Sequence, residues 1–328
     1  MPTNLPPEYF KVEERYKAAI DHDEKIKLLE ELISTIPKHK GTDKLRASLR
    51  KRLSKMKTDS HAQKKVSRHI SAYHIAKEGS GQIAIVGATN VGKSSLVHAL
   101  TNATPEVAEH PFTTWAPTPG MMDVGGAQIQ LIDTPPLNKE YVEPAFMDLI
   151  RRADLVALVV NLQGDPLGEL EYARALLEDN RIGPLCFEAR YPDELRFRLL
   201  PFLVVANKND DAETDEDFAI FCELLKDDWP IIAVSAKTGR GLDSFKKRVF
   251  QRLGIARIYS KPPGSEADLS QPFVVKVGTT IEELAGKIHK DFYDQLKSAR
   301  IWGSGSFDGQ LVGRDHVLED GDIVELKV

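Results

Sequence analysis

An eight-residue segment, Gly87-Ala-Thr-Asn-Val-Gly-Lys-Ser94, constrains the fold of this chain more than any other feature. It has the pattern G-x-x-x-x-G-K-[ST] and lies between a short apolar run, 83–86, and a helix that we expect to begin near Lys93. In that context the backbone N–H groups of the loop and the start of the helix cradle phosphate groups. The lysine reaches the terminal phosphates and the next hydroxyl ligates Mg²⁺. The strand and helix on either side favour this interpretation over a chance match to a Gly-rich turn.

Further apolar runs follow this loop at the spacing of buried strands, at 129–132, 155–160, 202–206 and 231–234. Helical segments lie between them, as at 169–180 and 216–225. Alternation of strand and helix predicts an α/β fold in which a doubly wound parallel sheet is covered on both faces. Ligands in such sheets bind at the carboxyl ends of the strands.

Four more features occur in order, each in a loop or at a strand end. Thr114, in a loop after the first helix, is placed to complete the Mg²⁺ shell, and Asp133 ends a strand where a carboxylate holds Mg²⁺ through water. Asn207-Lys-Asn-Asp210 and Ser235-Ala-Lys237 follow the next two strands. The Asp210 carboxylate can accept hydrogen bonds from both N1–H and the exocyclic amine of guanine. Adenine does not offer that pair, so the sequence favours GTP over ATP.

These motifs define the expected site. The residues expected to bind GTP or GDP are Gly87, Ala88, Thr89, Asn90, Val91, Gly92, Lys93, Ser94, Ser95, Asn207, Lys208, Asp210, Ser235, Ala236 and Lys237. The residues expected to hold Mg²⁺ are Ser94, Thr114 and Asp133, and those expected to act in catalysis are Lys93, Thr114 and Asn90.

The amino-acid sequence of several segments resembles the Obg-related group of P-loop GTPases. His110-Pro-Phe-Thr-Thr114, Pro119-Gly-Met-Met122 and Ala127-Gln-Ile-Gln-Leu-Ile-Asp-Thr-Pro135 are most similar to the developmentally regulated GTP-binding (DRG) proteins, as is the N-terminal stretch 36–42. The C-terminal stretch 312–326 resembles a TGS domain, a β-grasp module of ribosome- and tRNA-associated proteins. The resemblance implies a GTPase and, in some lineages, a small stabilising protein partner.

Two departures from this resemblance concern size and chemistry. Asn207 follows Asp133 by only 74 positions, which leaves no room for the extra domain that DRG proteins carry there. The group has Asp-x-x-Gly after the strand, but this chain has Pro136 at the Gly position, and proline has no N–H to donate to the γ-phosphate. Either γ-phosphate sensing is weakened, or Pro136 only stiffens a loop that still closes through Thr114 and Mg²⁺.

The position at which Ras-like enzymes carry a water-orienting Gln is occupied here by Leu137, which cannot position a proton. Catalysis must then rely on charge stabilisation by Lys93, Mg²⁺ and a further group. In related K⁺-activated GTPases an Asn at the place of Asn90 helps to coordinate K⁺, so the resemblance implies K⁺ as an additional cofactor. The alternative is that Asn90 only suits the backbone of the loop.

The charge of the chain is unevenly distributed. Residues 37–69 contain twelve Lys and Arg against two Asp, although the 328-residue chain has a net charge of −5. This favours a polyanion-binding arm on an acidic body, with a solvated helix face as the alternative. Apolar residues recur at helical spacing from residue 8 to about 36, and Thr42 is placed to cap a second helix. We therefore expect a basic helical hairpin within residues 1–78.

The C-terminal module is predicted after Pro262-Pro-Gly264, which we interpret as a boundary. Strands are expected at 273–277, 298–302, 310–312 and 323–327, with a helix at 280–290. The predicted domains are the hairpin at 1–78, the GTPase domain at 79–260 and a TGS-like β-grasp domain at 270–328.

Several classes of protein are excluded or disfavoured. No apolar run approaches the ~20 residues that span a bilayer, and no secretory signal or membrane partner is expected. Two Cys make neither a disulfide framework nor a metal site. We expect a cytoplasmic monomer that acts as a GTPase switch on the ribosome or on structured RNA. The alternatives are a nucleotide-gated RNA- or protein-binding module with little hydrolysis, and an ATPase, which Asp210 disfavours.

Overall fold

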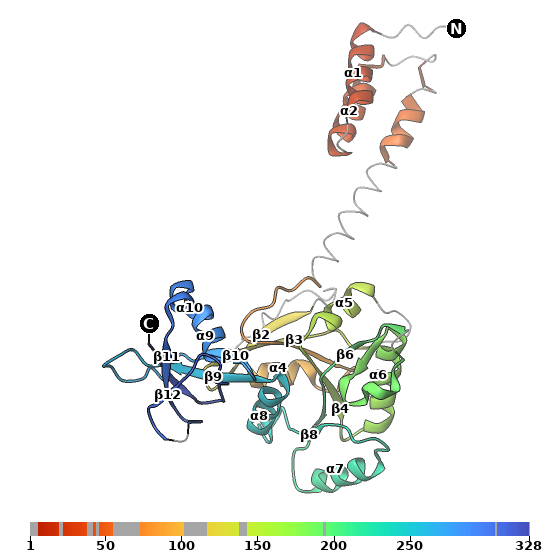
Figure 1. Ribbon diagram of the computed structural model, residues 1–328. Helices are drawn as coiled ribbons and strands as arrows, with labels where there is room; N and C mark the ends of the chain where they lie inside the picture. The colour runs from red at the N-terminus through yellow and green to blue at the C-terminus, as the bar shows by residue number, and fades with distance from the viewer. Residues whose placement is uncertain are drawn as a thin grey trace. The chain divides into compact units, whose positions relative to one another are not determined.

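The computed structural model describes residues 6–19, 22–37, 42–43, 46–54, 73–101, 117–137, 143–192, 195–305 and 307–327. The chain divides into two compact units, Met1–Ala72 and Tyr73–Val328 (Figure 1). The described residues contain no helix that is both long and apolar enough to cross a membrane.

The N-terminal unit contains two helices, α1 (Pro7–Ala18) and α2 (His22–Thr35), that pack against each other, and a helical segment at 46–54. The predicted single helix from 8 to about 36 is therefore wrong. Ala19 is extended, with ψ of 135°, and ends α1. A single helix would leave its apolar stripe in water, whereas two packed helices bury Tyr9, Val12 and Leu29 together.

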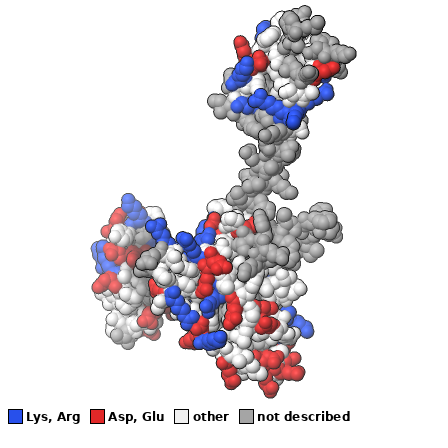
Figure 2. All heavy atoms as spheres, turned by 90° about the vertical axis from the view of Figure 1, so that its right-hand side faces the viewer, with Lys and Arg blue, Asp and Glu red and all other residues white. Residues whose placement is uncertain are grey.

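The helical segment at 46–54 places its apolar and basic side chains on different faces. Leu49 and Leu53 pack against the core of α1 and α2. Arg50, Lys51 and Arg52 are exposed, and Lys and Arg side chains are visible on the described surface of this unit (Figure 2). Most of the basic segment predicted at 37–69 lies outside the described residues.

The larger unit begins with a six-stranded sheet in the order β2-β3-β1-β4-β7-β8. Its parallel strands are β1 (Gln82–Gly87), β3 (Ala127–Asp133), β4 (Leu155–Asn161), β7 (Phe202–Asn207) and β8 (Ile231–Ala233). Alternate residues of a strand point to opposite faces. Accordingly Ala84 and Val86 of β1 lie in one core cluster and Ile83 and Ile85 in the other.

Helices cover both faces of this sheet, which confirms the predicted doubly wound α/β class. On one face lie α5 (Pro144–Arg152), α6 (Pro166–Asp179) and α7 (Glu213–Leu224). On the other lie α4 (Lys93–Leu100) and α8 (Leu242–Leu253), with Leu96 and Phe245 fully buried. Glu213, Asp215 and Glu216 crowd the first turn of α7, and acidic side chains dominate the lower end of Figure 2, where α7 lies.

One edge of the sheet departs from the predicted all-parallel arrangement. The strand β2 (Thr118–Val124) pairs antiparallel with β3 through a tight turn at Gly125 and Gly126. The strand was missed because its residues, Thr-Pro-Gly-Met-Met-Asp-Val, carry Pro and Gly and only partly alternate. A separate two-stranded sheet of β5 (Ile182–Pro184) and β6 (Arg198–Leu200), with the 3₁₀ helix η1 (Leu185–Arg190) after β5, precedes β7.

The C-terminal sheet has five strands in the order β10-β9-β13-β11-β12. They are β9 (Ile255–Ser260), β10 (Phe273–Lys276), β11 (Ser298–Trp302), β12 (Gln310–Val312) and β13 (Ile323–Lys327). Helices α9 (Ile281–Ile288) and α10 (Lys290–Gln295) follow β10, and Thr280 forms a capping box with Glu283 at the start of α9.

The first strand of this sheet, β9, falls on the other side of the predicted boundary at residue 260. It follows α8 directly after Gly254 and pairs antiparallel with β10 and parallel with β13. Pro262-Pro263-Gly264 therefore lies in the connection between two paired strands of one sheet. Proline and glycine favour tight turns within domains as well as linkers between them, which is why composition alone misplaced this boundary.

Candidate nucleotide-binding site

The carboxyl ends of β1, β3 and β7 open into one pocket of about 440 Å³. Among the described residues its lining consists of Thr89, Asn90, Gly92, Lys93, Ser94, Ser95, Asp133, Thr134, Pro135 and Lys208. The phosphate loop, the carboxylate after β3 and the lysine after β7 thus meet at one edge of the sheet, where the sequence placed them.

The phosphate loop is held to the end of β7 by Asn207. Its amide nitrogen donates to the carbonyl of Val91 at 2.9 Å, and the side chain is almost fully buried. Gly92 has a φ of 90°, and a Cβ at this position would lie 2.3 Å from Nδ2 of Asn207. The loop therefore needs glycine here, both for its backbone conformation and for the approach of Asn207.

Lys93 occupies the floor of the pocket. It is buried, and its Nζ donates to the carbonyl oxygens of Gly87 at 3.2 Å and Ala88 at 2.8 Å. Burial lowers the pKa of this lysine, and the charges of Asp133 and Glu169 act in the opposite direction. A buried ammonium held only by two carbonyls is well suited to exchange them for phosphate oxygens, which carry full negative charge.

Asp133 ends β3 beside Lys93 and fits a Mg²⁺ ion. Its Oδ1 is buried and has no hydrogen-bond partner among the described residues. Burial raises the pKa of this carboxyl, while a hydrogen bond from Ser94 and the charge of Lys93 lower it. Mg²⁺ prefers oxygen ligands and retains water in its shell. The buried Oδ1 and the Ser94 hydroxyl are therefore the donor set that would hold it.

The segment after Asp133 contributes Thr134 and Pro135 to the pocket lining, but two of its hydrogen-bond donors are engaged with β1. The Thr134 hydroxyl donates to the carbonyl of Ile85 at 2.7 Å, and the N–H of Leu137 donates to the carbonyl of Gly87 at 3.1 Å. The Leu137 side chain is 4% exposed and packs in the core beneath α5. Pro135 and Pro136 have no N–H. The Thr134 hydroxyl and the Leu137 N–H are therefore engaged elsewhere, and the two prolines between them offer no N–H to a γ-phosphate.

The two motifs predicted to recognise guanine, 207–210 and 235–237, lie next to each other. The Ser235 hydroxyl donates to Oδ1 of Asp210 at 2.6 Å, and Lys237 Nζ lies 3.8 Å from Oδ2 of the same carboxylate. The N–H of Ala236 donates to Oδ1 of Asn207 at 3.1 Å. Asn207 thus joins the phosphate loop to the 235–237 loop.

Thr114 lies outside the described residues, so the structure does not place this member of the predicted Mg²⁺ and catalytic sets. Asn90 is exposed at the pocket, with φ of 62°. Sequence reasoning also missed Glu169 of α6, which accepts a hydrogen bond from the N–H of Asn161 at 2.7 Å. Burial raises the pKa of Glu169, and the nearby charges of Lys208 and Lys93 oppose that shift. Glu169 belongs to no nucleotide-binding motif, and it lies near Lys93 because the first turn of α6 places it there.

Two family models match this chain. Residues 82–189 match a model described as 50S ribosome-binding GTPase, and residues 256–328 match the TGS domain. The second match includes β9, in agreement with the sheet pairing of that strand.

Relatives match almost the full chain. A GTP-binding protein of Halobacterium salinarum is 31% identical over 93% of this chain and 98% of its own length. Developmentally-regulated G-protein 3 of Arabidopsis thaliana is 25% identical over 92% and 98%, and Ribosome-interacting GTPase 1 of Saccharomyces cerevisiae is 25% identical over 92% and 98%. The first alignment spans 369 residues, so that relative has residues within the matched stretch that this 328-residue chain lacks.

A solved structure shares the fold. The YchF GTPase of Schizosaccharomyces pombe superposes with a TM-score of 0.55 at 16% sequence identity, over 77% of this chain and 99% of that chain.

Proposed function

Because the chain belongs to the family of GTP-binding proteins that includes the developmentally regulated G-proteins and joins a GTPase domain to a TGS domain, we propose that it hydrolyses GTP to GDP and phosphate with a slow intrinsic rate. It acts as a switch on the ribosome or on structured RNA. The observation that carries the enzymatic part is the pocket at the carboxyl ends of β1, β3 and β7, which Lys93, Asp133 and Lys208 line. Asp210 follows Lys208 by two residues and is held by the Ser235 hydroxyl.

In this proposal each residue has a defined task. Lys93 leaves the carbonyls of Gly87 and Ala88 and binds the terminal phosphates, while the N–H groups of the loop hold the others. Ser94 and Asp133 would hold Mg²⁺, which when bound would supply charge neutralisation at the phosphates. Asp210 selects guanine, and Asn207 keeps the phosphate and base loops at a fixed separation.

The slow rate follows from the segment after β3. Leu137 is buried and engages its N–H with Gly87, so it cannot orient the attacking water. If the protein is a GTPase, hydrolysis without a water-orienting side chain depends on Lys93, Mg²⁺ and a further cation, for which the exposed Asn90 in the same pocket is the candidate ligand. The second candidate is a nucleotide-gated binding module with little hydrolysis, and the segment after β3 also favours it.

Single-turnover hydrolysis in KCl and in NaCl at equal ionic strength tests these two candidates together. We expect a rate constant on the order of 10⁻⁴ to 10⁻² per second, as in GTPases that act without an activating partner, and a rate about fivefold or more higher in KCl. Asn90→Ala should remove the difference between the salts and leave GDP affinity within a small factor. Equal rates in both salts would reject the K⁺ site, and no phosphate release above the Asp133→Ala background would favour the binding module.

The partner proposal rests on charge and on the family. A relative bears the name Ribosome-interacting GTPase 1, and the TGS module resembles those of ribosome- and tRNA-associated proteins. In this chain the exposed basic side chains Arg50, Lys51 and Arg52 offer contacts to phosphates. The acidic face of α7 repels a polyanion and is not part of the RNA surface. We place the protein in the cytoplasm as a monomer, and the resemblance adds a small stabilising protein as a second partner.

The contribution of the basic face is measurable as a salt dependence. Replacing Arg50, Lys51 and Arg52 together by Ala should lower the slope of log affinity against log salt for ribosomes or structured RNA by about two to three units. Leu49 and Leu53 remain, so the fold of the N-terminal unit is kept. The control replaces three exposed acidic residues of α7 by Ala. An unchanged slope in the basic variant would show that this face is only solvated, and binding unaffected by nuclease would indicate a protein partner.

A further inference from the structure

We propose that Arg240 is a positioning residue for guanine recognition: it ties the loop that carries Asp210 to the loop that carries Ser235 and so holds the Asp210 carboxylate against the base. The inference rests on the proposed function, because it concerns the same nucleotide site. Arg240 lies outside the Asn207–Asp210 and Ser235–Lys237 motifs, and no sequence pattern marks it as a site residue.

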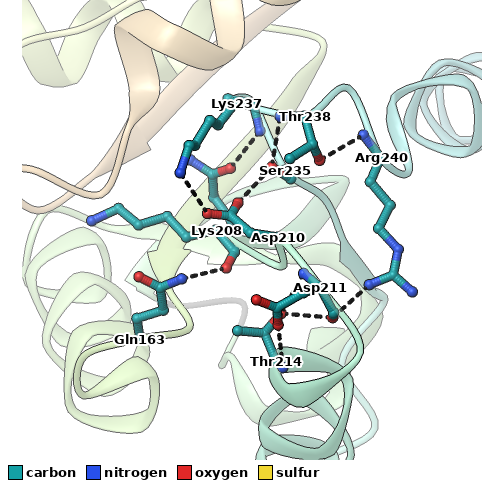
Figure 3. A network of polar contacts seen from close by, with 11 residues as sticks. Gln163, Lys208, Asp210, Asp211, Thr214, Ser235, Lys237, Thr238 and Arg240 are labelled. Carbon is teal, nitrogen blue, oxygen red and sulfur yellow. Dashed lines mark hydrogen bonds and ion pairs between the residues drawn. The ribbon is translucent and has the colours of Figure 1, made fainter.

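The side chain of Arg240 crosses from one loop to the other (Figure 3). Its Nη1 donates to the carbonyl oxygen of Asp211 at 2.8 Å, and its Nη2 donates to Oδ2 of Asp215 at 2.6 Å. Asp211 is the residue directly after Asp210, and Asp215 lies in the first turn of α7. The planar guanidinium makes both contacts at once, which a single ammonium group cannot reproduce with the same geometry.

Both acceptors of Arg240 are themselves fixed. The Asp211 carboxylate accepts from the N–H of Thr214 at 3.0 Å, and Thr214 Oγ1 accepts from the N–H of Asp211 at 3.1 Å. Asp215 also accepts from the amide of Asn209 at 3.0 Å. The bonds from Thr214 hold the pKa of Asp211 below its usual range, and the bonds from Arg240 and Asn209 do the same for the pKa of Asp215. Arg240 is therefore attached to a rigid start of α7.

The backbone of Arg240 is linked to the Asp210 carboxylate through a series of hydrogen bonds in the Ser235 loop. Its carbonyl accepts from the N–H of Ser235 at 2.9 Å. Its N–H lies 3.4 Å from Oγ1 of Thr238, whose own N–H donates to the Ser235 hydroxyl at 3.0 Å. That hydroxyl in turn donates to Asp210 at 2.6 Å. Arg240 thus grips the Asp210 loop through Asp211 and the Ser235 loop through its own backbone.

Release of this connection should affect one part of the base more than the rest of the nucleotide. Asp210 must present both carboxylate oxygens to guanine, one to N1–H and one to the 2-amino group. A small rotation of the loop keeps one of these bonds and loses the other, while the phosphate contacts, which depend on Lys93 and the phosphate loop, stay unchanged. Because Arg240 and Asp215 are 44% and 45% exposed, their ion pair adds little to global stability.

The test compares GDP with IDP, which lacks the 2-amino group, on the full chain. We expect the wild-type protein to bind GDP roughly 10- to 100-fold more tightly than IDP, since the lost bond is to a charged acceptor. Arg240→Ala should reduce this ratio by about fivefold or more, mainly through weaker GDP binding. Arg240→Lys should recover part of the ratio because one donor remains. Arg248→Ala, at an exposed position of α8, is the matched control and should keep the wild-type ratio.

The outcomes distinguish a failure of the proposed function from a failure of the positioning role of Arg240. If wild-type protein binds no GDP, the proposed function fails. If it binds GDP and Arg240→Ala keeps the wild-type IDP/GDP ratio, Arg240 has no positioning role. Equal weakening of both nucleotides, together with a lower melting temperature, would show that Arg240 is only structural and would also overturn the inference.

Discussion

Asp210→Asn is expected to convert the guanine site into one that prefers xanthine. The amide oxygen of Asn can still accept the guanine N1–H, but its NH₂ group then faces the 2-amino group, so two donors meet. Xanthine has a carbonyl at that position, and the same NH₂ group can donate to it. We expect GDP affinity to fall by about 100-fold or more, because a bond to a charged acceptor is replaced by an unsatisfied pair of donors. Affinity for XDP should rise above that for GDP.

Calorimetric titration of both nucleotides into the variant measures this exchange. The Ser235 hydroxyl, which donates to Asp210 at 2.6 Å, can also donate to an amide oxygen, so the loop should keep its fold. Asp243→Asn, in the first turn of α8, makes the same chemical change outside the site and should bind GDP like wild type. GDP affinity unchanged in Asp210→Asn would mean that this carboxylate does not contact the base.

Lys93→Met is expected to separate stability from binding. The native state buries the Lys93 ammonium at a cost, which is why its pKa is lowered. Methionine fills similar space without that charge, so the melting temperature without nucleotide should stay the same or rise. The variant should lose the stabilisation by GDP and Mg²⁺, which for wild-type protein at 100 times the Kd is about 2.7 kcal/mol.

Thermal melts with and without GDP measure both effects in one series. Lys247→Met, an exposed position of α8, is the control and should melt like wild type in both conditions. Two results would contradict the assignment of Lys93 to the phosphates. One is a full GDP-induced shift in Lys93→Met, and the other is a large loss of stability in its absence.

Much of the fold and site was accessible from sequence because the nucleotide motifs are local. The residue types of Gly87–Ser94 and Asn207–Asp210 identify these motifs, and the apolar runs around them predict parallel strands. The strands 298–302, 310–312 and 323–327 also form as predicted. These motifs predicted where the candidate site would lie, because the carboxyl ends of the strands in a parallel sheet gather at one edge.

The features that escaped sequence reasoning depend on contacts between distant segments. β9 joins the C-terminal sheet through β10 and β13, and no local pattern distinguishes it from a further strand of the larger sheet. Leu137 is buried in a core cluster made by distant segments, and its N–H donates to the carbonyl of Gly87, 50 positions before it. Arg240 acquires its role only because Asp211 and Asp215 are brought to it by the fold.

Competition between GTP and ATP for the wild-type protein, in the presence of Mg²⁺, tests the central claim most directly. We expect the protein to bind GTP and GDP, and to bind ATP at least about 100-fold more weakly than GTP, because adenine cannot donate two hydrogen bonds to the Asp210 carboxylate. Equal affinities for GTP and ATP would contradict it.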